Sequence, residues 1–199
     1  MPRPAARPGE DAAATRGRIL DIAQRLIQDR GYNGFSYRDV AVEIGIRAPT
    51  IHHYFPAKSD LATALVERYA ADVAALQAAL ARDEPRPWKR LAGYFAATRE
   101  RMLAKRQLCL CGVLAMEANS LPDNVRNAVD RFFADNRAWV ADQLRQAKAA
   151  REIDFSGAAE DAAAMIVSAL QGGLLLSRAA KTPEPFDAAV KQVSRALGF

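Results

Sequence analysis

Apolar residues recur at helical spacing along almost the whole chain, and this pattern limits the fold more than any other feature. In the first clear example, Ile19, Ile22, Ala23, Leu26 and Ile27 occupy positions i, i+3, i+4, i+7 and i+8, one face of an amphipathic helix. No segment alternates apolar and polar residues as a half-buried strand does. We therefore expect an all-α protein of about nine helices.

Turn and cap signals break the N-terminal part into short helices. Gly31 is placed to end the first helix in a left-handed conformation, and Ser36 with Asp39 resembles a capping box with Asp in place of Glu. A second short helix ends in a tight turn at Gly45, and a third is expected over residues 48–54. Two short helices joined by a glycine-containing turn, behind a longer helix, are typical of a helix-turn-helix.

Composition and breaks in the pattern suggest the domain limits. Residues 1–14 contain three prolines and no apolar run, so we expect a flexible arm rather than a signal peptide. Residues 15–60 form the three-helix head, and a fourth helix joins it to a larger helical body within residues 61–199. The segment ARDEPRP, residues 81–87, ends that fourth helix.

Charge, hydropathy and cysteine content narrow the class of protein. The formal net charge of +5 indicates a basic patch rather than a basic tail. No uncharged apolar run approaches 18 residues, and two cysteines do not make the disulfide framework of a secreted protein. We expect a cytoplasmic protein without a membrane partner.

Catalysis and metal binding find little support. The histidines His52 and His53 are adjacent, so on a helix they point about 100° apart and make a poor metal pair. No segment brings together a His, an Asp and a nucleophile. We predict neither enzymatic activity nor a cofactor or metal.

The segment IGIRAPTIHHYFPAKSDL, residues 44–61, has the composition of a surface that meets DNA. Ile46, Ile51 and Phe55 are spaced to face the core. The remaining polar and basic side chains of the third helix point outward, where they can bond to phosphates or base edges. In a helix-turn-helix this second short helix enters the major groove.

A longer stretch carries a family resemblance. Residues 15–69, TRGRILDIAQRLIQDRGYNGFSYRDVAVEIGIRAPTIHHYFPAKSDLATALVERY, closely resemble the DNA-binding domain of TetR-family transcriptional regulators, with the glycines, the pair Tyr54-Phe55 and Lys58 in place. The resemblance implies a homodimer, formed through the last two helices, whose recognition helices read a palindromic double-stranded DNA operator. It also implies repression until a small-molecule effector binds the C-terminal domain.

By position, the resemblance implies DNA contacts for Tyr37, Arg38, Arg47, Thr50, His52, His53, Tyr54 and Lys58. Lys58 would hold a phosphate together with the first N–H groups of the fourth helix. Tyr37 and Arg38 would touch the backbone or groove edge from the second helix. A solvated charge at Arg38 and a half-core position for Tyr54 are the alternatives.

The C-terminal body must supply the ligand pocket. Candidate lining residues at helical spacing are Phe95, Arg99, Met102, Cys109, Leu114, Phe132, Asn136, Trp139 and Met165. Ordinary core packing is the alternative for each. Arg99 and Asn136 are the most informative, because a buried polar group needs a partner and a ligand would provide one.

The segment CLCGVLAMEANSLPDNVRNAV, residues 109–129, resembles the ligand domain of one subgroup, in which Cys is common at the position of Cys109 and some members respond to electrophiles or oxidants. Lys105 and Arg106, within one turn, would lower its pKa. Within one helix, Cys109 and Cys111 would point about 200° apart, a poor geometry for a disulfide. The alternative is a small buried hydrophobe.

Two adjacent glycines mark the penultimate helix. Gly172 and Gly173 each cost about 1 kcal/mol against Ala in a helix interior. They indicate a close helix–helix approach across a dimer interface, or a kink beside the pocket.

The chain is thus expected to be a ligand-responsive dimeric regulator that represses transcription. It would bind its operator through residues 36–58 and release it when a small molecule or electrophile is sensed in the C-terminal domain. The alternative is an all-α small-molecule-binding or electrophile-scavenging protein without an operator.

Overall fold

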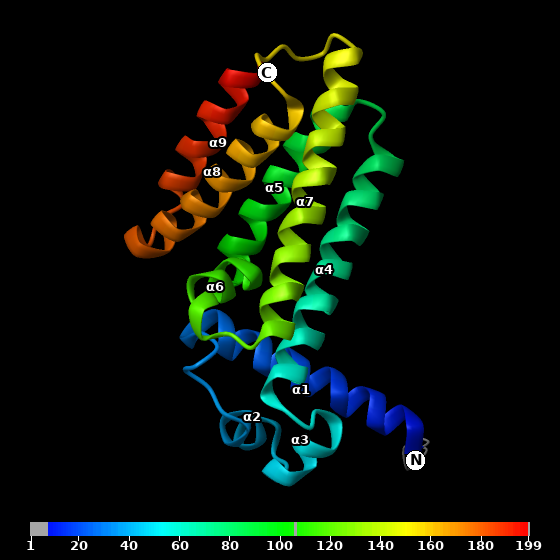
Figure 1. The fold of residues 1–199 in the computed structure, drawn as a ribbon, viewed down its shortest axis with the longest axis vertical. Coiled ribbons are helices and arrows are strands. Elements are labelled where there is room, and N and C mark those ends of the chain that lie inside the picture. The colour runs from blue at the N-terminus through cyan, green and yellow to red at the C-terminus, as the bar shows by residue number, and fades with distance from the viewer. Residues whose placement is uncertain (1–7, 106, 199) are drawn as a thin grey trace, which may run out of the picture.

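The computed structural model describes residues 8–105 and 107–198, with only the backbone described for residues 8–11 and 102–105. This part of the chain is helical and contains no strand, as expected (Figure 1). Its elements are α1 (Pro8–Arg30), α2 (Tyr37–Ile44), α3 (Ala48–Tyr54), α4 (Lys58–Asp83), α5 (Pro87–Lys105), α6 (Leu110–Met116), the 3-10 helix η1 (Ala118–Ser120), α7 (Asp123–Ala149), α8 (Ala159–Ala180) and α9 (Glu184–Leu197).

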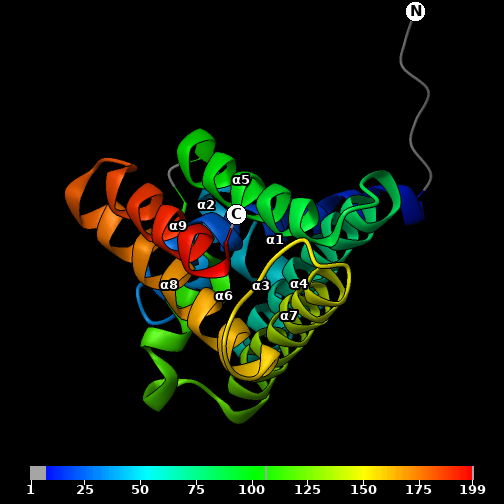
Figure 2. The same ribbon diagram turned by 90° about the horizontal axis from the view of Figure 1, so that it is seen from above.

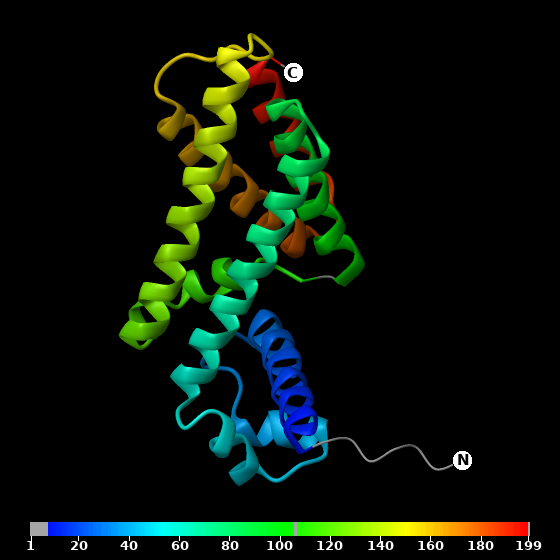
Figure 3. The ribbon, with the colours of Figure 1, turned by 90° about the vertical axis from the view of Figure 1, so that its right-hand side faces the viewer.

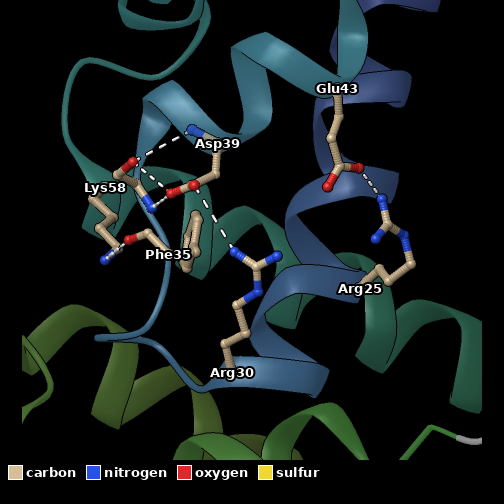
Figure 4. Close-up of polar contacts among 7 residues, drawn as sticks. Arg25, Arg30, Phe35, Asp39, Glu43 and Lys58 are labelled. Atoms are coloured by element: carbon tan, nitrogen blue, oxygen red, sulfur yellow. Dashed lines mark hydrogen bonds and ion pairs between the residues drawn. The ribbon is translucent and has the colours of Figure 1, made fainter.

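The predicted turn signals of the head are confirmed. Ser36 caps α2 by accepting a hydrogen bond from the Asp39 N–H, and the Asp39 carboxylate accepts one from the Ser36 N–H at 2.7 Å (Figure 4). Gly31 and Gly45 follow α1 and α2 with φ of 80° and 76°, the left-handed conformation that glycine adopts without strain. These local signals set the ends of both helices.

The first helix begins earlier than predicted. Residues 8–14, expected to belong to a flexible arm, form the first turns of α1, while residues 1–7 lie outside the described residues. The acidic pair Glu10 and Asp11 suits a helix N-terminus, and the alanines that follow have the highest helix propensity. The helix-favouring effect of these residues is stronger than the helix-breaking effect of the prolines that suggested a flexible arm.

The fourth helix connects the head to the body. Figure 3 shows α4 running from the helix-turn-helix into the helical bundle. It packs on α1 in the head and on α5 and α7 in the body, and α6 lies between α1 and α7. A pocket in the body is therefore linked to the head by continuous packing.

Helices α8 and α9 pair along one side of the body (Figures 1 and 2). Of the described helices, α8 is the one whose length and composition suit a membrane span, although no such span was predicted. It packs against α7 and α9, as a core helix does. Three large apolar side chains of α8, Met165, Leu175 and Leu176, are nevertheless 47%, 46% and 59% exposed.

The two glycines of α8 have different surroundings. A Cβ at Gly173 would lie 3.0 Å from the Cα of Phe186, so the close approach is to α9 of the same subunit rather than across a dimer. At Gly172 a Cβ would meet nothing within 4 Å. The prediction of a close approach holds for Gly173, but its partner is intramolecular.

Candidate DNA-binding surface and sensor pocket

Helix α3 presents its polar residues to solvent. Ile51 is fully buried and Phe55, just after the helix, is 3% exposed, so these two side chains hold α3 against the head. The outward residues Arg47, Thr50, His52 and His53 are exposed, and Tyr54 is half-buried. The predicted positions are confirmed for Ile51 and Phe55 in the core and for the four exposed residues, whereas Tyr54 fits the half-core alternative.

The charges around α3 favour contact with an anion. Arg38 on α2 is exposed, and neither Arg38 nor Arg47 forms an ion pair with a described residue. The acidic residues nearby in sequence have partners within the protein: Glu43 pairs with Arg25 (Figure 4), and Asp60 accepts a hydrogen bond from the Ala57 N–H at 2.9 Å. Two unpaired guanidinium groups are thus available to phosphates.

Tyr37 lies inside the head, which corrects its prediction as a DNA contact. Its ring is 8% exposed and its hydroxyl donates a hydrogen bond to the carbonyl of Phe55 at 2.8 Å. Burial raises the pKa of Tyr37 to about 12. The ring also meets His52 edge-on at 4.7 Å, so Tyr37 joins α2 to the end of α3.

We expect Tyr37→Phe to lower the free energy of unfolding by about 1 kcal/mol, because the Phe55 carbonyl loses its donor. Urea unfolding measures this change. Tyr54→Phe is the matched control, since the Tyr54 hydroxyl forms no hydrogen bond with a described residue, and it should leave stability nearly unchanged. Unchanged stability in Tyr37→Phe together with weaker DNA binding would restore Tyr37 as a DNA contact.

Lys58 is held within the head in this structure. Its ammonium donates to the carbonyl of Phe35 at 2.5 Å (Figure 4). It also lies 4.7 Å and 4.4 Å from the ring centroids of Tyr32 and Phe35. Burial lowers the pKa of Lys58. A phosphate contact would therefore require the ammonium to leave Phe35, so the predicted role now competes with a structural one.

A pocket lies in the body between α4, α5, α7 and α8. Its lining residues are Tyr69, Val73, Leu76, Tyr94, Ala97, Thr98, Arg101, Gln107, Leu108, Cys109, Phe132, Gln171 and Leu174. A second hollow on the other side of Cys109 is lined by residues of α6 and α8, including Met116 and Leu175. Of the predicted ligand-binding residues, Cys109 and Phe132 line the first pocket.

The other predicted pocket residues lie elsewhere. Phe95 and Leu114 are buried core residues, and Trp139 packs on Tyr94 at 5.4 Å, all outside the two pockets described here. Met165 is exposed on α8, and the side chain of Met102 lies outside the described residues.

The two polar candidates have protein partners, which corrects the expectation that a ligand would satisfy them. Arg99 makes a two-pronged ion pair with Asp187 of α9, at 2.6 Å and 2.9 Å. The buried Asn136 accepts a hydrogen bond from Gln77 at 2.9 Å. Both partners are far away in sequence, so local patterns gave no sign of them.

The environment of Cys109 favours the thiolate. Cys109 precedes α6 rather than lying within it, so the assumption that Cys109 and Cys111 share one helix was wrong. Hydrogen bonds from the Cys111 thiol, the Tyr69 hydroxyl and the backbone N–H groups of Gly112 and Cys111 outweigh burial and lower the pKa of Cys109 to about 6. Burial raises the pKa of Cys111.

The lowering of this pKa has causes that were not predicted, while the predicted one stays untested. The side chains of Lys105 and Arg106, expected to lower the pKa, lie outside the described residues. Among the described residues, the groups that lower the pKa of Cys109 include Tyr69 of α4. The hydroxyl of this tyrosine was the one feature of the sequence that indicated such a contact, because a buried Tyr hydroxyl usually forms a hydrogen bond.

Hydrogen bonds tie the pocket region to the end of α1. Gln28 donates to the carbonyl of Leu108, next to Cys109, at 2.6 Å. Glu117, after α6, accepts from the backbone N–H of Tyr32 at 2.8 Å, and Arg178 of α8 donates to the carbonyl of Gln28 at 2.8 Å. No local pattern in the sequence predicted these contacts, because they join residues 80, 85 and 150 positions apart.

Comparisons with known proteins agree with this architecture. Residues 19–65 match the family described as bacterial regulatory proteins, tetR family, and residues 87–192 match the C-terminal domain described as transcriptional regulator LmrA/YxaF-like. The HTH-type transcriptional repressor NemR of Escherichia coli K12 is 23% identical over 186 residues, 92% of this chain and 94% of that protein. The transcriptional regulator AcuR of Cereibacter sphaeroides is 24% identical over 193 residues, 93% of this chain and 86% of that protein.

Solved structures have the same fold. A transcriptional regulator of the TetR family from Agrobacterium tumefaciens is 30% identical and superimposes with a TM-score of 0.90, over 94% of this chain and 99% of that chain. The reduced form of Escherichia coli NemR superimposes with a TM-score of 0.82 at 24% identity, over 92% of this chain and 97% of that chain. At 24% identity the likeness to NemR shows the fold alone.

Proposed function

This chain belongs to the TetR family of transcriptional regulators, and from that premise we propose that it is a cytoplasmic homodimer that represses transcription from a palindromic operator. Its family and relatives are regulators rather than enzymes. The observation that carries the proposal is the solvent-facing polar surface of α3, next to two arginines without acidic partners. A small molecule or electrophile that enters the Cys109 pocket releases the DNA.

The roles on the DNA follow from the position of each side chain. Arg38 and Arg47 bind phosphates, and Thr50 and His53, fully outward on α3, read base edges. His52 stands against Tyr37 and has its Nδ1 3.2 Å from the carbonyl of Pro56, so it supports the end of α3 while its other edge faces the groove. Tyr54 contacts the DNA backbone from the rim of this surface, and Lys58 does so once its ammonium leaves the carbonyl of Phe35.

Selection of bound sequences from random duplex DNA tests this proposal. We expect an enriched palindrome with half-sites about one helical turn, or a multiple of it, apart. His53→Ala should relax the preference at one or two positions in each half-site, whereas Arg38→Ala should weaken binding to all sequences alike. If the folded protein enriches no sequence, the proposal of a regulator fails, and the result supports the alternative of an electrophile-scavenging protein without an operator.

Release of the DNA requires that ligand binding in the pocket lowers the affinity of the head for DNA. This coupling is a free energy, and it acts equally in both directions. The contacts of Leu108 with Gln28 and of Glu117 with Tyr32 start in the segment that contains Cys109 and end at the junction of α1 with the helix-turn-helix. A ligand that displaces this segment changes the position of α1 relative to the body. In a dimer, such a movement alters the spacing of the two recognition helices and hence the fit to successive major grooves.

The dimer interface is proposed on the paired helices α8 and α9, because three large apolar side chains of α8, Met165, Leu175 and Leu176, are exposed. Leu176→Glu should raise the dimer dissociation constant by about 10- to 100-fold, because a carboxylate would be buried without a partner. Analytical ultracentrifugation over a concentration series measures this change. Val42→Glu, at a 74% exposed position in the head, is the control and should leave the dimer intact; an equally stable dimer in both variants would place the interface elsewhere.

A further inference from the structure

Among the lining residues that the structure describes, the Cys109 pocket holds one cationic side chain beside the reactive sulfur and no carboxylate. Among the described residues that line it, Arg101 is the one with a charged side chain, and no Asp or Glu is present. The polar side chains around it, those of Thr98, Gln107 and Gln171, include hydrogen-bond donors. Arg101 and these donors offer a carboxylate its hydrogen bonds on the pocket wall, beside the Cys109 sulfur.

Arg101 forms no ion pair with a carboxylate of any described residue. It is half-buried at the pocket wall, and its guanidinium lies 5.6 Å from the ring centroid of Tyr69, without an ion pair to any described residue. The contrast with Arg99, two residues earlier, is direct, because Arg99 is neutralised by Asp187. A partly desolvated guanidinium binds a carboxylate well, since two parallel hydrogen bonds replace the lost water.

Tyr69 connects this cation to the nucleophile. The guanidinium of Arg101 lies near its ring, while its hydroxyl is hydrogen-bonded to Cys109. Arg101 and Cys109 thus both interact with the Tyr69 side chain, and both line the same pocket. A ligand of a few carbons reaches the two groups together.

We propose that the effector is a small carboxylate that carries an electrophilic carbon, with Arg101 binding the carboxylate and Cys109 attacking the carbon. The inference rests on the proposed function and names the chemical class of its effector. With a haloacetate the step is complete without an oxidant: the Cys109 sulfur forms a bond to carbon, the carbon–halogen bond breaks, and halide leaves with the electron pair. The product is a thioether whose carboxylate stays on Arg101.

Iodoacetate and iodoacetamide form the matched probes, because they share the reacting carbon and leaving group and differ in charge. The rate of each with Cys109 is measured by mass spectrometry of the Cys109 peptide, and free cysteine in the same buffer serves as reference. We expect the ratio of iodoacetate to iodoacetamide rates at Cys109 to exceed that of free cysteine by roughly tenfold. In Arg101→Gln the ratio should fall to that of free cysteine.

Arg99→Gln is the control variant, since Arg99 is paired and lies outside the pocket, and it should keep the wild-type ratio. Protection of the wild-type protein by unreactive ligands gives a second measurement that needs no variant. Propionate should slow the reaction of Cys109 with iodoacetamide, whereas propionamide at the same concentration should not. Three results would each overturn the inference. The first is a wild-type ratio equal to that of free cysteine, and the second is a ratio that Arg101→Gln leaves unchanged. The third is equal protection by propionate and propionamide.

The same samples are tested for binding to the selected duplex, which separates the two proposals. If iodoacetamide and iodoacetate abolish DNA binding at equal rates, the proposal of a transcriptional regulator stands and the carboxylate site is rejected. An Arg101-dependent preference for iodoacetate in a protein that selects no DNA would keep the site and reject the regulator.

Discussion

Replacing Ile51 by alanine should lower the free energy of unfolding by about 2 to 4 kcal/mol and abolish operator binding at protein concentrations that saturate the wild type. Ile51 is the one buried residue of α3, and the helix is seven residues long. A helix of this length has no stability of its own. The residue at its N-cap, Arg47, provides no side-chain hydrogen bond to the helix, so packing must fix its orientation.

Urea unfolding and titration with the selected duplex measure the two effects. Val42→Ala is the matched control, because it shortens a β-branched side chain that is 74% exposed in the same head, and it should change stability by less than about 0.5 kcal/mol. If Ile51→Ala loses DNA binding while its unfolding free energy stays unchanged, Ile51 contacts DNA and the orientation of α3 derived above is wrong.

The head could be predicted closely because its signals are local. Ser36 and Asp39 are three residues apart and cap α2 on their own, and Gly45 ends α2 with its own backbone conformation. Such features act within one turn of chain, so a single sequence is sufficient to place them. The outward side of α3 followed from the same spacing once Ile51 was assigned to the core.

The pocket could be predicted only in part, because its composition depends on contacts between distant segments. Arg99 and Arg101 look equivalent in sequence, yet one meets Asp187, 88 residues away, while the other faces the pocket. Asn136 looked like a ligand contact until Gln77 of α4 supplied its hydrogen bond. The packing of whole helices decides which of several polar residues has no partner within the protein.

Lys58 and Tyr37 show a further limit of positional reasoning. Both were placed at the DNA surface by resemblance, but the structure gives each a partner inside the head: Phe35 for Lys58 and Phe55 for Tyr37. A side chain near a recognition helix either touches the DNA or holds the helix in place. Exposure separates these roles, and it depends on tertiary contacts.

The reactivity of Cys109 should follow an unusual pH profile. We expect its rate with iodoacetamide to rise between about pH 5 and 7 and then level off, because its pKa is lowered to about 6 from an ordinary 9.0. At pH 7 the thiolate fraction is then roughly 0.9 instead of roughly 0.01, on the order of a 100-fold difference. Because the pKa of Cys109 is lower in the folded protein, its contribution to folding stability is complete above about pH 9 and is lost as the pH falls through about 6.

The main cause of this lowering, the hydrogen bond from the Cys111 thiol, supplies the test. In Cys111→Ala the midpoint of the Cys109 profile should move to higher pH, because alanine donates no hydrogen bond to the thiolate. Cys111 does not obscure the wild-type profile, since burial raises its own pKa and keeps it protonated. The rates are measured by mass spectrometry of the Cys109 peptide and corrected for hydrolysis of iodoacetamide at each pH. The midpoint of the profile depends on how the rate changes with pH, so it does not depend on how slowly a buried thiol reacts. A wild-type rate that still climbs tenfold per pH unit between 7 and 8 would mean that Cys109 is an ordinary buried thiol, and the electrophile would then have to be sensed by another group.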